Sequence, residues 1–122
     1  MKRILLVEDD DLARGYFRTL LEGEGYEVVE ARNGRDGVRL FRESPCDLIV
    51  MDIFMPRKSG LDALVELDPN ASGIPVIAIS GAGGGTGADP LHLAETLGAA
   101  RTFRKPFETA AFLAGVKELI GD

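Results

Sequence analysis

Three runs of consecutive apolar residues, each about the length of one strand, constrain the fold of this chain more than any other feature. They occupy residues 4–7, 48–51 and 76–79. A strand with one face in water alternates apolar and polar residues, whereas an uninterrupted apolar run is typical of a strand buried on both faces. Such strands occur in parallel sheets that carry helices on both sides, so the sequence predicts an α/β protein.

Weaker strand patterns and helical spacings fill the intervals between these runs. Two further strands are expected at residues 26–30 and 99–103. Helices are expected where apolar residues recur at helical spacing: Leu12, Tyr16, Phe17, Leu20 and Leu21; Val38 and Phe41; Leu61, Leu64 and Val65; Leu91, Ala94 and Leu97; and Phe112, Val116, Leu119 and Ile120. Asp10 or Asp11 is placed to cap the first helix. Five strand–helix repeats predict a five-stranded, doubly wound parallel sheet, a (βα)5 fold.

The composition fits one domain. With 45% hydrophobic residues, 122 residues suffice for one compact core, so a single domain is expected over residues 1–122. The net charge of −6 argues against nucleic-acid binding, because clustered lysine and arginine hold a phosphate backbone. The single cysteine, Cys46, excludes an internal disulfide and favours a reducing compartment. No stretch approaches the ~20 apolar residues of a membrane span, so a cytoplasmic location without membrane contact is expected.

Polar side chains follow four of the five expected strands, at the point where each strand ends. Glu8 and Asp9 follow the first strand, and Asp52 follows the third. Ser80 follows the fourth strand and Lys105 the fifth. In an open α/β sheet the carboxyl ends of the strands share one edge, and ligands bind there. Three carboxylates, a hydroxyl and an ammonium are therefore expected in one site.

Three carboxylates in one cleft repel one another, and a hard divalent cation relieves that repulsion. Mg²⁺ binds carboxylate and carbonyl oxygens, keeps several waters and accepts a phosphoryl oxygen as a ligand. Asp52 is then predicted to attack phosphorus, while Lys105 and the Ser80 hydroxyl hold the remaining phosphoryl oxygens. Taken singly, Glu8 and Asp9 could cap a helix and the others could belong to turns. Their joint position at strand ends favours a site.

The chain resembles response-regulator receiver domains over essentially its whole length. The residues that carry the resemblance are 4–10, 47–56 with Gly60, 79–81, 98–99 and 105–107. Two motifs are specific in combination, namely Asp-x-x-Met-Pro-x-x-x-Gly, which starts at Asp52, and Lys-Pro-Phe, which starts at Lys105.

The resemblance implies a flavodoxin-like receiver fold with Asp52 as the phosphoacceptor. It implies a Mg²⁺ site, which Mn²⁺ could also occupy, with these ligands: Glu8, Asp9, Asp52 and the main-chain carbonyl of Phe54. Ser80 and Lys105 would bind the phosphoryl group and relay its presence. The donor would be a histidine kinase or a phosphotransfer protein. The target would be another protein or a missing output domain, since the chain is either a free-standing receiver or a fragment. The implied role is signalling rather than enzymatic, with self-catalysed phosphorylation and dephosphorylation.

Two features depart from the family pattern. Thr102 stands three residues before the lysine, where family members commonly carry a switch aromatic, and Phe103 is expected to point into the core instead. The glycine-rich stretch 81–87 is longer than the family norm, and we expect phosphorylation to order it together with the fourth helix. Phe54 and Ala82 are apolar and are expected to exclude hydrolytic water from the phosphoryl group.

Three other interpretations rest on the same residues. An aspartyl-phosphate phosphatase of the haloacid-dehalogenase type needs a second acid two residues after Asp52, where Phe54 stands. A flavodoxin-like cofactor binder needs a phosphate-binding loop after the first strand, where residues 8–11 are all acidic. A docking module that does not depend on phosphate would share the fold. Thr102 favours that last interpretation, and the complete set of polar site residues opposes it.

Overall fold

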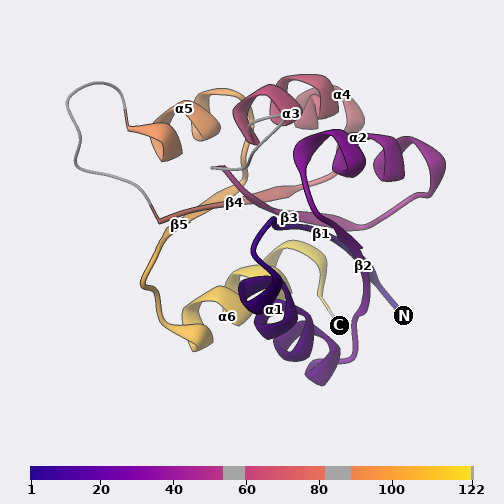
Figure 1. Cartoon of the computed structure of the whole chain (residues 1–122), viewed down its shortest axis with the longest axis vertical. Coiled ribbons are helices and arrows are strands. Elements are labelled where there is room, and N and C mark those ends of the chain that lie inside the picture. The colour runs from indigo at the N-terminus through magenta and orange to yellow at the C-terminus, as the bar shows by residue number, and fades with distance from the viewer. Residues whose placement is uncertain (54–59, 82–88, 122) are drawn as a thin grey trace.

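The five strands form one parallel sheet. The computed structural model describes residues 1–53, 60–81 and 89–121. The strands are β1 (Arg3–Val7), β2 (Glu27–Ala31), β3 (Leu48–Asp52), β4 (Val76–Ser80) and β5 (Arg101–Arg104). They lie in the order β2–β1–β3–β4–β5, and every neighbouring pair is parallel. The chain thus starts near the middle of the sheet and extends it in both directions, which confirms the predicted doubly wound topology (Figure 1).

Helices cover both faces of this sheet (Figure 1). One face carries α1 (Asp11–Gly23) and α6 (Thr109–Ile120). The other carries α2 (Gly34–Glu43), α3 (Gly60–Leu67), α4 (Pro69–Ser72) and α5 (Pro90–Thr96). The single turn α4 was not predicted; it lies between Asp68 and Gly73, which both have left-handed backbone conformations. Within the described residues, no helix has the length and apolar character needed to cross a membrane.

Alternate residues of the buried strands contribute to two separate cores. In β1, Leu5 and Val7 belong to the core under α2, α3 and α5, whereas Ile4 and Leu6 belong to the core under α1 and α6. All four are at most 2% exposed. Successive side chains of a strand point to opposite faces, and here both faces are covered. This arrangement explains the continuous apolar runs of the sequence.

The predicted apolar stripe on α1 is only partly correct. Phe17 and Leu21 are buried in the core, as expected. Five residues correspond to about 140° around a helix, so Leu12 lies far from the face that carries Phe17. Arg14 occupies the buried face in its place. Leu12 and Tyr16 of this stripe are instead exposed, and so is Val65 of the stripe predicted for α3.

Gly60 starts α3 at a point where the helix packs directly against the end of β3. Its N–H donates to the carbonyl of Ile53 at 2.8 Å. A Cβ atom at this position would lie 2.6 Å from the carbonyl oxygen of Asp52 and 2.6 Å from the Cα of Ile53. Both neighbours are main-chain atoms, so no side-chain rotation can relieve the contact. Glycine is therefore needed for this close approach of α3 to Asp52.

We predict that Gly60→Ala lowers the free energy of unfolding by about 1–3 kcal/mol, the usual cost of overpacking. Urea titration measures the change. Gly15→Ala is the matched control, because no atom lies within 4 Å of a Cβ built at that position in α1. Alanine has a higher helix propensity than glycine, so Gly15→Ala should be neutral or stabilising. An unchanged stability of Gly60→Ala would contradict the close packing at the end of β3.

Candidate functional site

The predicted site residues lie at the carboxyl ends of four strands. Glu8 and Asp9 follow β1, and Asp52 is the last residue of β3. Ser80 is the last residue of β4 and has no exposed surface. Lys105 follows β5, and its main-chain N–H donates to the Ser80 carbonyl at 2.9 Å. The parallel register therefore places these residues along one edge of the sheet.

Three carboxylates of this edge converge. Glu8, Asp9 and Asp52 each offer one carboxylate oxygen, and the three oxygens lie within 4.8 Å of one another. Glu8 is 2% exposed and Asp52 is 8% exposed, whereas Asp9 is open to solvent. Three clustered carboxylate oxygens with one open side match the oxygen ligands and retained waters of a hard divalent cation.

Lys105 bridges the two buried carboxylates. Its Nζ lies 3.1 Å from Asp52 Oδ2 and 3.3 Å from Glu8 Oε1. Partial burial by itself would lower the pKa of Lys105, but the carboxylates of Asp52 and Glu8 outweigh burial and raise it. The lysine is therefore a permanent cation that partly neutralises the acidic cluster.

Glu8 is the carboxyl group that the site perturbs most clearly. Burial, reinforced by the charge of Asp52, raises the pKa of Glu8 to about 7, against the opposing effects of the Asp10 N–H and Lys105. Burial raises the pKa of a carboxyl group because it disfavours the charged form. A divalent cation at the cluster would favour that charged form, so the chemistry of the three acids fits such an ion.

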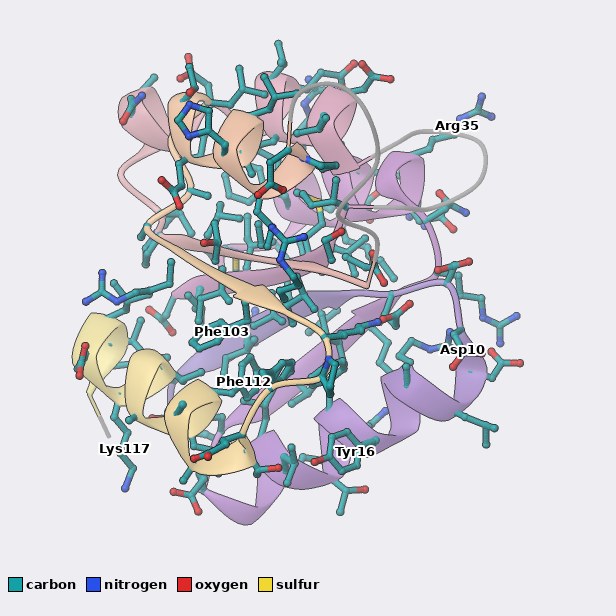
Figure 2. The ribbon with its side chains drawn as sticks, turned by 90° about the vertical axis from the view of Figure 1, so that its left-hand side faces the viewer. Asp10, Tyr16, Arg35, Phe103, Phe112 and Lys117 are labelled. Atoms are coloured by element: carbon teal, nitrogen blue, oxygen red, sulfur yellow. The ribbon has the colours of Figure 1, made fainter. Side chains whose placement is uncertain are left out.

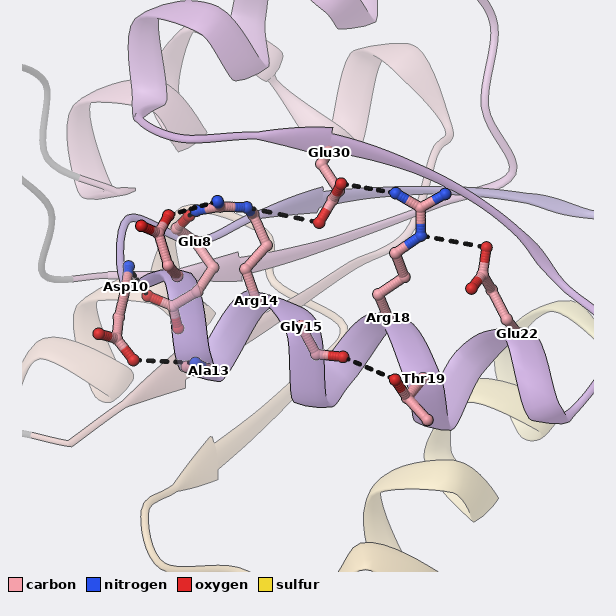
Figure 3. A network of polar contacts seen from close by, with 10 residues as sticks. Glu8, Asp10, Ala13, Arg14, Gly15, Arg18, Thr19, Glu22 and Glu30 are labelled. Atoms are coloured by element: carbon pink, nitrogen blue, oxygen red, sulfur yellow. Dashed lines mark hydrogen bonds and ion pairs between the residues drawn. The ribbon is translucent and has the colours of Figure 1, made fainter.

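The turn from β1 into α1 is fixed by local hydrogen bonds (Figure 3). The Asp10 carboxylate accepts from the Ala13 N–H at 2.8 Å and so caps α1, which confirms one of the two predicted caps. The Asp10 N–H donates to Glu8 Oε2 at 3.1 Å. Arg14, which was not predicted to take part, donates from Nη1 to the Glu8 carbonyl at 3.1 Å. The sequence hints at this role only in that Arg14, a charged residue, lies on the same helix face as the apolar Leu21.

The two unusual residues of β5 point in opposite directions. Phe103 packs against Phe107 and Phe112, with ring centroids 5.5 and 5.8 Å away (Figure 2). The prediction that Phe103 points into the core is thus confirmed. Thr102 Oγ1 donates to Glu95 Oε1 of α5 at 3.2 Å. The position where the family commonly has an aromatic therefore connects β5 to α5 by a polar contact.

Some predictions fall outside the described residues. They concern the main-chain carbonyl of Phe54 as a metal ligand, the apolar flank formed by Phe54 and Ala82, and the glycine-rich stretch beyond Gly81. They stay predictions.

Glu8 leads to a prediction for the metal-free protein. Its pKa is about 7 when folded and near the ordinary 4.5 when unfolded. The folded state therefore binds more protons between these values, and stability falls as the pH rises from about 4.5 to about 7. Urea titrations in the presence of a chelator measure this slope. Glu8→Gln should lack this component, so the same slope in both proteins would contradict the assignment.

Comparison with known proteins agrees with this arrangement. The family model for the response regulator receiver domain matches residues 4–117. The polar-differentiation response regulator DivK of Brucella anthropi is 35% identical over 99% of this chain and 98% of its own. DivK of Brucella ovis is 34% identical with the same coverage.

Solved structures of receiver domains are also similar to this chain. The receiver domain of the sensor histidine kinase PA1611 from Pseudomonas aeruginosa, which holds a magnesium ion in its active-site cleft, superposes with a TM-score of 0.86 at 26% identity, over 99% of this chain and 98% of that one. A receiver domain protein from Clostridium thermocellum gives 0.85 at 29% identity, over 98% and 94%. The chain belongs to the response regulator receiver domain family.

Proposed function

We propose that Asp52 accepts a phosphoryl group and that this modification switches a surface of the domain for partner binding. Receiver domains take phosphoryl groups from histidine kinases and bind Mg²⁺ at an acidic pocket. The observation that carries the assignment is the position of Asp52. It ends the central strand β3, with Lys105 Nζ at 3.1 Å and the carboxylates of Glu8 and Asp9 beside it.

The cation would be held by three carboxylates, from Glu8, Asp9 and Asp52, together with the main-chain carbonyl of Phe54 from outside the described residues. Mg²⁺ is the expected ion, and Mn²⁺ accepts similar oxygen ligands. When bound, the ion supplies charge neutralisation and orients the incoming phosphoryl group.

The chain's own residues perform the transfer. A carboxylate oxygen of Asp52 forms a bond to phosphorus, while the bond from phosphorus to the donor breaks and the donor atom leaves with the electron pair. Lys105 contacts Asp52 and Glu8, and it would bind a phosphoryl oxygen once a cation balances the charge of Glu8. The Ser80 hydroxyl, at the end of the neighbouring strand β4, would hold another oxygen and relay the change to α5.

The role that follows is that of a signalling acceptor which catalyses its own phosphorylation and dephosphorylation. A histidine kinase or a phosphotransfer protein would supply the phosphoryl group. A separate protein or an attached output domain would read the modified surface.

The proposal is tested by the intact mass of the protein after incubation with Mg²⁺ and acetyl phosphate. One added phosphoryl group is expected on the wild type and none on Asp52→Asn, because only the carboxylate is a competent nucleophile. A chelator should abolish the adduct. Asparagine is close to aspartate in size, so the Asp52→Asn variant should fold normally. Its folding is checked as the control.

The absence of an adduct on the wild type, combined with a failure to bind beryllofluoride, would contradict the proposal. That outcome would favour a docking module that does not depend on phosphate, which the polar contact between Thr102 and Glu95 also suits.

A further inference from the structure

Arg14 is the only buried arginine or lysine side chain in residues 1–53, 60–81 and 89–121. It is 8% exposed and lies on the face of α1 that is turned toward the sheet. Burying an unpaired guanidinium would be costly in free energy. The partners of Arg14 therefore indicate which part of the structure its buried charge stabilises.

Arg14 has three partners, and they come from different elements (Figure 3). Its Nη1 donates to the carbonyl of Glu8 at 3.1 Å. Its Nη2 pairs with Asp11 in the first turn of α1, and its Nε lies 3.4 Å from Glu30 Oε1 on β2. The guanidinium is planar and rigid, so carboxylates on two elements fix the direction in which it donates to Glu8.

The main chain of Glu8 is thereby held from both sides. Its N–H donates to the Ala31 carbonyl at the end of β2, at 3.0 Å. Its carbonyl accepts from Arg14. That carbonyl belongs to the peptide unit that joins Glu8 to Asp9, and the plane of this unit sets the directions in which both side chains leave the backbone. The mutual approach of the carboxylate oxygens therefore depends on the orientation of this peptide.

The contact goes to the carbonyl of Glu8 and not to its carboxylate. Arg14 therefore takes up no carboxylate oxygen of Glu8, whose carboxylate partners include Lys105 and the Asp10 N–H.

We propose that Arg14 is a positioning residue of the acidic site, one that orients the Glu8–Asp9 peptide for divalent-cation binding. The inference rests on the proposed Mg²⁺-dependent function and adds a residue that does not touch the ion or the phosphoryl group.

Arg18, one turn further along α1, provides the matched control (Figure 3). Its Nη1 lies 2.6 Å from Glu30 Oε2, and its Nε lies 3.1 Å from Glu22 Oε2. It thus shares Glu30 with Arg14 and carries the same charge. Among the described residues, its hydrogen bonds go to these two carboxylates and not to Glu8.

The test is calorimetric titration of the metal-free protein with MgCl₂ at constant ionic strength. Arg14→Met and Arg14→Lys should both raise the Kd for Mg²⁺ about tenfold, the usual effect of losing a partner that orients a ligand. Lysine keeps the charge but lacks the fork that fixes the direction of donation. Arg18→Met should leave the Kd unchanged.

Phosphorylation by acetyl phosphate gives a second readout that separates positioning from chemistry. The Mg²⁺ concentration for half-maximal rate should rise in the Arg14 variants, while the rate at saturating Mg²⁺ stays that of the wild type. A fall in the saturated rate without a change in Kd would contradict a positioning role.

Two results would overturn the inference while leaving the proposed function intact. Arg14→Lys could bind Mg²⁺ as tightly as the wild type, so that charge alone matters, or Arg18→Met could weaken binding equally. If Arg14→Met does not fold, Arg14→Lys decides the question. A wild type that does not bind Mg²⁺ at all would instead refute the proposed function, and the inference with it.

Discussion

The bridge from Lys105 to two buried carboxylates is the interaction on which the acidic site depends. Glu8 and Asp52 are almost fully buried at the end of the sheet, where two uncompensated negative charges would be strongly unfavourable. Lys105 Nζ lies within 3.3 Å of both. One cation between two anions still leaves excess negative charge. Burial and then the charge of Asp52 raise the pKa of Glu8, and Lys105 only partly opposes them. A divalent ion is the natural complement to that excess.

The fold supplies this arrangement through its strand order. Because β1 and β3 are neighbours at the middle of the sheet, Glu8 and Asp52 emerge side by side. The ladder between β4 and β5 continues past the strand ends and brings Lys105 to the same edge. Gly60 lets α3 approach the end of β3, and Arg14 reaches the opposite side of the cluster from α1. Each of these elements is fixed by packing that is independent of any ligand.

Much of this architecture could be predicted from the sequence, because continuous apolar runs report burial on both faces of a strand. The strand ends then located Glu8, Asp52 and Lys105 without further information. The exposure of Leu12 could not be read from apolar spacing, since a broad stripe does not show which edge faces the core. The burial of Arg14 was equally hidden, because its partners lie on β2 and in the preceding turn.

Steric contacts between separate segments of the chain could not be predicted from a local pattern either. The resemblance to receiver domains singled out Gly60 by its position in a motif, but only the structure shows that a Cβ would strike the main chain of Asp52 and Ile53. The contact of Thr102 with Glu95 depends on how α5 lies against β5, which no spacing in the sequence specifies.

In the proposed function, Lys105 exchanges its contact with Glu8 for one with a phosphoryl oxygen when a divalent ion enters the site. A crystal structure of the protein with Mg²⁺ and beryllofluoride would show whether this exchange occurs. We expect beryllofluoride on Asp52, the ion on the carboxylates of Glu8, Asp9 and Asp52, and Lys105 Nζ in contact with fluoride rather than with Glu8. Beryllofluoride bound at Asp52 with the contact between Lys105 and Glu8 intact, or an ion bound elsewhere, would contradict it.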